Sequence, residues 1–477
     1  MNRLRLFVLH CLCTVAFAIP VGAAPSLPPL ALHDGMRRES IQPHASYLVS
    51  GESALAVWNK KEQFQPLDDN SFGYSSETYW LHFRVENPDN VERTFYLEYD
   101  FPPFDDIQVY RMQSGEEPAQ ALASPEKKGG DRYPFHEREM DYRNVVFSFE
   151  HQPGSSYDYL IRLETTSSML VSLNGYTEET IVSHIGQEQI ILGLYYGIML
   201  AMVVTNLFLL VSTRDRTYLF YILYIISYVL FQATLNGLTY QYLWPGAVEW
   251  GNNCLPFFIF LACGGILIYC RSFLNSKEHT PGTDRLYWIV LVFNIAGLFS
   301  ALFLFNYRIN LIAAVILTLV TLALVLANGI HTMILGVRQA RFFLAAWILF
   351  LLGGGLNVLK SAGFLPDNIL TTYGIQIGSA LEVMVLSLGM ADRINQLSAS
   401  LKKNVNALSA ARHESEKISV RLQTLVEESD DFIFTLDESW NFTMANKSFQ
   451  RILKYGQEEL LSMNFLELIY NRDWKDS

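Results

Sequence analysis

The stretch Ile190–Ser212 reads IILGLYYGIMLAMVVTNLFLLVS and contains no charged side chain. A helix needs about 20 mainly apolar residues to cross the hydrocarbon core of a bilayer. Six more apolar stretches follow, at Tyr218–Leu235, Cys254–Cys270, Leu286–Phe305, Ile309–Ile330, Phe342–Leu359 and Ile369–Met390. A helix of a soluble core would carry charges on its outer face, whereas these stretches are apolar all round. The sequence therefore predicts a seven-transmembrane helix domain over residues 187–391.

The basic residues of this domain are concentrated in alternate loops. The segments after spans one, three, five and seven contain Arg214, Arg216, Arg271, Lys277, Arg285, Arg338, Arg341, Arg393, Lys402 and Lys403. The loops on the other side contain only Arg308 and Lys360. Because basic loops stay in the cytoplasm, we expect the region before span one to lie outside and the region after Met390 to lie inside.

The N-terminus has the pattern of an export signal. Arg3 and Arg5 precede the apolar run Leu6–Ala18, and small residues follow as far as Ala24. A basic start, a short apolar middle and small residues at the end are typical of a cleaved signal peptide. We expect residues 1–24 to be removed; the alternative is an uncleaved anchor helix.

Composition excludes several classes of function. The 477-residue chain is long enough for several domains, and its net charge of −12 argues against a nucleic-acid partner. The sequence contains no His or Cys cluster with metal-ligand spacing, no phosphate-binding glycine loop and no Gly-x-Ser-x-Gly elbow. We therefore predict no catalytic residues, no metal site and no cofactor for this chain.

Residues 25–183 have the pattern of an antiparallel β-sandwich. Short alternating runs are separated by Asn-Pro, Ser-Gly and Pro-Gly turn signals, at Tyr79–Val85, Arg93–Tyr99, Ile107–Tyr110, Asn144–Phe149, Tyr157–Leu163 and Met169–Leu173. Period-two alternation predicts that Trp80 and the aromatic residues opposite it share one buried face.

Several motifs resemble one family. In the exported domain they are Trp80-Leu81-x-Phe83-x-Val85-x-Asn87-Pro88, Asp131-x-x-Pro134-Phe135-x-Glu137-Arg138 and Tyr142-Arg143-Asn144-x-Val146-Phe147. In the membrane domain they include Asn236-Gly237, Tyr242-Leu243-Trp244-Pro245 and Gly378-Ser379-Ala380-Leu381-Glu382. Residues 48–395 thus resemble bacterial seven-transmembrane receptors with diverse intracellular signalling modules, with the second type of periplasmic domain. The resemblance implies an inner-membrane location, a jelly-roll similar to carbohydrate-binding modules, and a glycan or other small-molecule ligand.

A charged and aromatic segment of the exported domain is the candidate ligand site. Loops on a rigid scaffold often carry binding residues, and a sugar site needs an aromatic face with charged hydrogen-bonding groups. The candidates are Asp131, Phe135, Arg138, Tyr142 and Arg143. The alternative is a surface loop whose arginines pair with Asp131, Glu137, Glu139 or Asp141, because charge clusters are usually solvated.

Of the residues well inside the seven predicted spans, Glu382 is the one with an ionisable carboxyl group. An intramembrane carboxylate normally faces the bundle interior or a wet cavity. We predict either a transmembrane switch contact or a static interhelical hydrogen bond, with Asn206, Asn328 or Asn357 as partner. No chain of charged residues crosses the spans, so a transporter is poorly supported.

Residues 392–425 predict a coiled-coil signalling helix. A heptad seam is formed by Ile394, Leu397, Leu401, Asn404, Leu408, Ala411, Ser415, Ile418, Leu422 and Leu425. A buried Asn favours two strands, so we expect a parallel homodimer. The alternative is a single amphipathic helix that packs on the membrane bundle.

Residues 426–477 resemble the first half of a PAS domain. A strand at Asp431–Asp437 and a second strand at Phe442–Ala445 are followed by Asn446, a natural helix N-cap. So short a segment cannot close a PAS core, and we expect that the chain is a fragment or that its gene is broken.

These features together predict a sensory receptor that passes a periplasmic signal to a cytoplasmic output module. By resemblance, that module is a histidine kinase or a diguanylate cyclase, neither of which is present in the sequence. The alternatives are a membrane-embedded enzyme, which needs more intramembrane catalytic groups than Glu382, and a glycan-binding scaffold protein.

Overall fold

The computed structural model describes residues 27–304, 306–361, 364–366 and 368–470. The predicted signal peptide at residues 1–24 lies outside these residues. The chain divides after Met390 into two compact units, which are described one at a time.

The first unit begins with a β-sandwich. Its strands are β1 (Leu30–Ala31), β2 (Glu39–Ser40), β3 (Ser46–Val49), β4 (Gln65–Pro66), β5 (Ser71–Tyr74), β6 (Tyr79–Glu86), β7 (Arg93–Tyr99), β8 (Asp106–Gln113), β9 (Lys127–Gly129), β10 (Val145–His151), β11 (Ser156–Glu164), β12 (Ser168–Leu170) and β13 (Leu173–Tyr176). One sheet has the order β4-β3-β6-β11-β8-β9, with β1 also paired to β6. The second sheet has the order β10-β7-β13-β2, and β5 pairs with β12.

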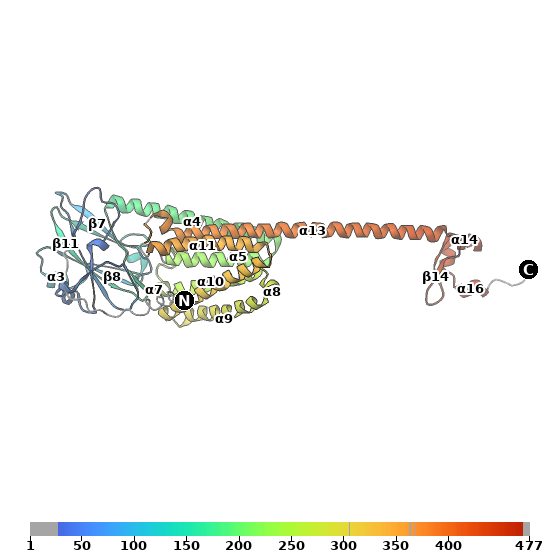
Figure 1. Ribbon diagram of the computed structural model, residues 1–477, viewed down its shortest axis with the longest axis horizontal. Helices are drawn as coiled ribbons and strands as arrows, with labels where there is room; N and C mark the ends of the chain where they lie inside the picture. The colour runs from blue at the N-terminus through green and yellow to red at the C-terminus, as the bar shows by residue number, and fades with distance from the viewer. Residues whose placement is uncertain (1–26, 305, 362–363, 367, 471–477) are drawn as a thin grey trace, which may run out of the picture. The chain divides into compact units, whose positions relative to one another are not determined.

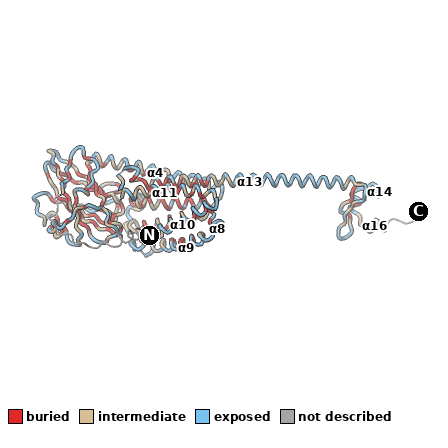
Figure 2. Tube along the Cα trace, in the orientation of Figure 1, coloured by how far each residue is buried: buried red, intermediate tan, exposed pale blue. Residues whose placement is uncertain are grey.

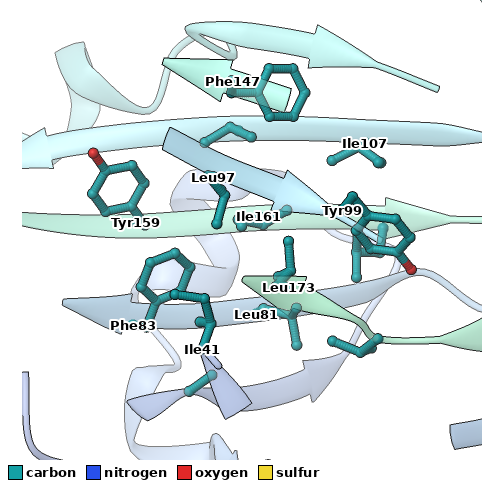
Figure 3. Packing of buried hydrophobic residues seen from close by; sticks show 14 of the residues in the cluster. Ile41, Leu81, Phe83, Leu97, Tyr99, Ile107, Phe147, Tyr159, Ile161 and Leu173 are labelled. Atoms are coloured by element: carbon teal, nitrogen blue, oxygen red, sulfur yellow. The ribbon is translucent and has the colours of Figure 1, made fainter. Parts of the chain in front are cut away.

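The two sheets enclose an aromatic and aliphatic core. Phe83 and Tyr159 stack with ring centroids 5.1 Å apart, and Phe149 meets Tyr159 edge to face at 5.1 Å. Figure 3 shows Tyr159 and Ile161 of β11 and Phe83 of β6 beside Leu97, which comes from β7 of the other sheet. Among the described residues the sandwich has no disulfide, so this burial of apolar surface is its main source of stability.

The prediction that Trp80 and aromatic residues opposite it share a buried face is confirmed, since Trp80 is buried and its ring centroid lies 5.8 Å from that of Tyr110. Tyr79, Leu81, Phe83 and Val85 face the space between the sheets. Trp80 is also buried, but in a separate cluster under the short helices α2 (Ala54–Trp58) and α3 (Pro118–Ala121). These helices cover the outer face of the sheet, so β6 is buried on both faces at its start.

The membrane domain contains seven helices, among the described residues, that are long and apolar enough to cross a bilayer. They are α4 (Glu178–Thr213), α5 (Arg216–Leu235), α7 (Val248–Phe273), α9 (Pro281–Phe303), α10 (Tyr307–Ile334), α11 (Gln339–Ser361) and α13 (Gly374–Glu428), with the short helices α6 (Leu238–Tyr242), α8 (Ser276–His279) and α12 (Ile369–Thr372) between them. The number of predicted spans is confirmed, and so is the predicted fold class. Phe305, the predicted end of span four, lies outside the described residues.

The seventh span differs from the prediction at both ends. The predicted span began at Ile369, but Ile369–Thr372 form the separate helix α12, and α13 begins at Gly374. Beyond Met390 the helix continues to Glu428, so the predicted coiled-coil segment and the last span are one helix. Figure 2 shows α13 turning from buried to exposed along its length.

Glycine allows α13 to approach α11 closely. A Cβ atom on Gly353 would lie 2.2 Å from the carbonyl oxygen of Gly374 and 2.9 Å from the Cα atom of Gly378. Small residues at such contacts let helix backbones meet in a membrane. Gly353, Gly374 and Gly378 therefore serve helix packing.

The sandwich continues into the first span without a linker, as Figure 1 shows. Strand β13 ends at Tyr176, Thr177 is the N-cap residue, and α4 begins at Glu178. The Thr180 hydroxyl accepts a 3.0 Å hydrogen bond from the Thr177 backbone N–H. Any displacement of β13 therefore acts directly on the first transmembrane helix.

The second unit has the elements that the sequence predicted. Strands β14 (Phe434–Leu436) and β15 (Phe442–Ala445) pair, and helices α14 (Lys447–Leu453), α15 (Gln457–Leu461) and α16 (Phe465–Tyr470) follow. The Asn446 side chain accepts from the Phe449 N–H at 3.2 Å, as expected of an N-cap. The end of the predicted PAS segment, residues 471–477, lies outside the described residues.

A buried carboxyl group lies where the second sheet meets α4. Glu98 on β7 is fully buried and accepts hydrogen bonds from Asn144 and from the Tyr176 hydroxyl, both at 2.7 Å. The imidazole of His184 on α4 lies 3.7 Å away. Burial, together with the nearby negative charge of Asp100, raises the pKa of Glu98 to about 7.

This raised pKa predicts a pH-dependent stability. Between the ordinary pKa of a glutamate and about 7, the folded state holds a proton that the unfolded state has lost, so the stability falls as the pH rises. Glu98→Gln removes this loss. The difference in melting temperature, variant minus wild type, should therefore increase by several degrees between pH 5 and pH 8. Scanning fluorimetry in detergent measures this difference. Glu117→Gln, at an exposed position, is the control. A melting-temperature difference between Glu98→Gln and the wild type that stays constant from pH 5 to pH 8 would contradict the prediction.

Candidate functional site

The segment 131–143, in which sequence analysis placed a ligand site, lies against the membrane domain. The Phe135 N–H donates to the Pro245 carbonyl at 3.0 Å, and the Tyr240 hydroxyl donates to the Tyr133 carbonyl at 2.6 Å. The Gln241 amide donates to the Asp141 carboxylate at 3.1 Å. The loop between spans two and three thus holds the segment along most of its length.

Arg138 is enclosed within this junction. Its guanidinium carbon lies 4.7 Å from the Phe135 ring centroid and 5.7 Å from that of Tyr240. One guanidinium nitrogen donates to the carbonyls of Tyr142 and Arg143, at 3.2 Å and 2.7 Å. Burial lowers the pKa of Arg138 to about 10, although the charge of Asp131 acts against this shift. Arg138 is therefore a structural cation between two aromatic rings.

Arg143 forms an ion pair with the first transmembrane helix. Its Nη2 lies 2.6 Å from Glu188 Oε1, and its Nε lies 2.9 Å from Oε2, which makes the pair bidentate. Their side chains are only 11% and 7% exposed. Breaking a buried pair by removing one partner typically costs about 3–5 kcal/mol, because the other charge remains buried.

Glu188 connects three parts of the first unit. Besides Arg143, its carboxylate accepts a hydrogen bond from the Tyr142 hydroxyl of the sandwich. It also accepts one, at 3.3 Å, from the Tyr373 hydroxyl, which immediately precedes α13. The sandwich, the first span and the start of the seventh span thus share one carboxylate.

Asp131 contacts a different helix of the membrane domain. The side-chain amide of Asn252 on α7, oriented so that its nitrogen donates, lies 2.7 Å from Asp131 Oδ1. Burial, with the charge of Asp105, raises the pKa of Asp131 to about 8.

The backbone at Gly237 fits tightly under the sandwich. Gly237 has a φ of +76°, and a Cβ atom there would lie 2.7 Å from Pro102 and 3.0 Å from the Arg143 carbonyl oxygen. Glycine is the residue that adopts this conformation without strain. The preceding carbonyl, of Asn236, accepts from Arg143 at 3.5 Å.

The structure brings the five predicted site residues together, but at an interdomain junction. Their charged groups bond to Glu188, to Asn252 and to backbone carbonyls. The alternative prediction, in which the arginines pair with acids of the same loop, is wrong for Arg143, whose partner is Glu188. Ligand binding by these five residues stays a prediction.

Glu382 is fully buried in α13, but its partner is not one of the predicted asparagines. Both carboxylate oxygens accept from the Tyr224 hydroxyl on α5, at 2.9 Å and 3.1 Å. Asn206 instead donates to the hydroxyl of Ser387, and Asn328 to that of Ser276. The role of Glu382 as a switch stays a prediction.

Hydroxyl groups bond to α13 along its buried length. The contacts that hold it to α4 and α5 are Tyr195 to Ser379 at 3.1 Å, Tyr221 to the Val383 carbonyl at 2.5 Å and Asn206 to Ser387 at 3.1 Å. With the bond from Tyr224 to Glu382, these contacts form a row of polar interactions along the buried part of α13.

Sequence analysis missed Glu188, Tyr224 and Tyr373. A tyrosine inside an apolar run counts as apolar in a hydropathy reading, although its hydroxyl needs a partner when buried. Glu188 lies two residues before the first apolar run and was not considered. Its position next to a span, ten residues after the start of α4, is the signal that could have marked it.

Comparison with known families gives three matches in order along the chain. Residues 44–177 match the model of the extracellular 2 domain of seven-transmembrane receptors with diverse intracellular signalling modules, and residues 188–393 match the seven-transmembrane domain of the same receptors. Residues 421–474 match the PAS fold. A search among curated proteins finds no match. The chain therefore belongs to the seven-transmembrane receptors with diverse intracellular signalling modules, with an extracellular domain of the second type and a PAS fold after the membrane domain.

Proposed function

We propose that the chain is an inner-membrane receptor whose periplasmic sandwich senses a small molecule and whose last helix carries the signal to the cytoplasm. The observation that supports this most directly is the carboxylate of Glu188, which joins the sandwich to the first span and to the start of α13. A receptor needs such a mechanical connection, because a ligand acts only by preferring one of two conformations.

The direction of the chain across the membrane is part of the proposal. The basic residues that follow spans one, three, five and seven support a cytoplasmic location for the C-terminal unit. The sandwich then lies in the periplasm, and its junction with Glu188 lies at the periplasmic side of the membrane domain.

The proposed output step is dimeric. The seam residues on α13 are exposed in the single chain, with Leu401, Leu408 and Leu425 at 66%, 72% and 60%. An apolar heptad stripe of this length is buried best by the same stripe of a second copy. The signal would then pass through a parallel pair of α13 helices to the PAS fold, and from there to a histidine kinase or diguanylate cyclase.

The proposed topology predicts opposite labelling at the two ends. Ser114→Cys, on an exposed turn of the sandwich, should react with a membrane-impermeant maleimide in intact spheroplasts. Asn406→Cys, exposed on α13, should react only after lysis. The buried Cys254, Cys263 and Cys270 give a low background. Labelling of both variants in intact spheroplasts would refute the topology.

Coupling between the junction and the seam can be measured by cysteine cross-linking. Leu408→Cys should form disulfide-linked dimers in membranes, whereas Asn406→Cys, on the opposite face of the heptad, should not. Adding Arg143→Gln with Glu188→Gln removes both junction charges and should change the cross-linking rate at residue 408 about fivefold or more, a typical allosteric coupling. Arg84→Gln breaks an ion pair within the sandwich and is the control. An unchanged rate in the junction variant would contradict the relay.

The Tyr224–Glu382 bond predicts a graded loss of stability. Tyr224→Phe leaves a buried carboxyl group without its partner, at a cost of about 1–3 kcal/mol. Glu382→Gln keeps an acceptor for the Tyr224 hydroxyl and should cost less. Thermal unfolding in detergent tests this order. The cross-linking assay then tests the switch. If Leu408→Cys forms disulfides at the same rate with and without Glu382→Gln, the charge of Glu382 has no role in the switch.

A further inference from the structure

A cavity of about 490 Å³ lies between the sandwich and two loops of the membrane domain. The sandwich contributes residues such as Tyr74, Asp105 and Arg132, and the membrane domain contributes Asn252, Asn253 and Arg308. Small-molecule sites are commonly 300–1,000 Å³ and often lie at domain interfaces. The cavity is therefore large enough for a small ligand, and a ligand in it would touch both domains.

Two arginines and one aspartate line this cavity, and the aspartate is already paired. Asp105 is saturated: it accepts from Arg132 at 3.1 Å, from the Thr165 hydroxyl at 3.1 Å and from the Thr166 hydroxyl at 2.9 Å. Arg308, in contrast, forms no ion pair with any residue that the structure describes. It stands in the first turn of α10, where the helix dipole adds positive charge. Arg308 is therefore the lining group that can pair with an anionic group of a ligand.

The remaining lining is suited to hydroxyl groups. Ser75, Ser76, Asn252 and Asn253 present hydroxyl and amide groups, and Tyr74 and Tyr307 present aromatic rings. Amides and hydroxyls both donate and accept, which matches the hydroxyls of a sugar. A second hollow, of about 450 Å³, lies beside Arg143 and Glu188, but those two charges already neutralise each other.

We propose that this cavity is the receptor's ligand site and that its ligand is a small sugar acid, whose carboxylate pairs with Arg308. This inference rests on the proposed function and deepens it. It places the ligand at the start of the segment 131–143, where Arg132 lines the cavity, and not at the five predicted site residues; Asn252 both lines the cavity and contacts Asp131.

The test uses the full chain in nanodiscs of phosphatidylcholine, so that no anionic headgroup competes, and measures binding by calorimetry. The probes are galacturonate and galactose, which differ by a carboxylate in place of a hydroxymethyl group. Galacturonate should bind at least about tenfold more tightly, and Arg308→Gln should remove that advantage. Arg37→Gln, at an exposed position of the sandwich outside the cavity, should bind as the wild type does.

Three results would overturn the proposal: no binding of galacturonate, equal binding of galactose, or unchanged binding by Arg308→Gln. Adding galacturonate to the Leu408→Cys cross-linking assay separates this inference from the function on which it rests. Binding that depends on Arg308 but leaves the cross-linking rate unchanged supports the site and counts against the relay.

Discussion

The arrangement of the first unit depends on one buried ion pair, between Arg143 of the sandwich and Glu188 of the first span. Neither charge is tolerable alone in this environment, because a buried ion needs a partner to offset its lost hydration. The two domains must therefore keep the relative position in which Arg143 reaches Glu188. The hydroxyls of Tyr142 and Tyr373 bond to the same carboxylate, so the position of the seventh span is tied to that of the sandwich.

The loop between spans two and three supports this geometry from the other side. Arg138 lies against Phe135 and Tyr240, and Gly237 allows the backbone to meet Pro102 and Arg143. These contacts explain why a segment rich in arginine and aromatic residues need not itself bind a ligand. The same side-chain chemistry serves to dock one domain of the protein onto another.

Features that depend on local sequence were predictable, and features that depend on distant partners were not. The seven spans follow from the length of apolar runs, and the Asn446 cap follows from its immediate neighbours. The burial of Trp80 was predicted, but what covers it was not, because α2 and α3 cover a sheet face that alternation alone would leave to solvent. The junction was not foreseen, since Arg143 and Glu188 are 45 residues apart and nothing in their neighbourhoods pairs them. The partner of Glu382 was missed because Tyr224 reads as one more apolar residue of its span.

The direct passage from β13 through Thr177 into α4 restricts how such receptors can be recombined. Each residue inserted into a helix turns everything beyond it by about 100° and shifts it by about 1.5 Å. One extra residue between Thr177 and Glu188 would swing the carboxylate away from the guanidinium it faces. A chimera that exchanges the exported module between relatives should therefore be spliced after this carboxylate, so that the sandwich travels together with the opening turns of its own helix.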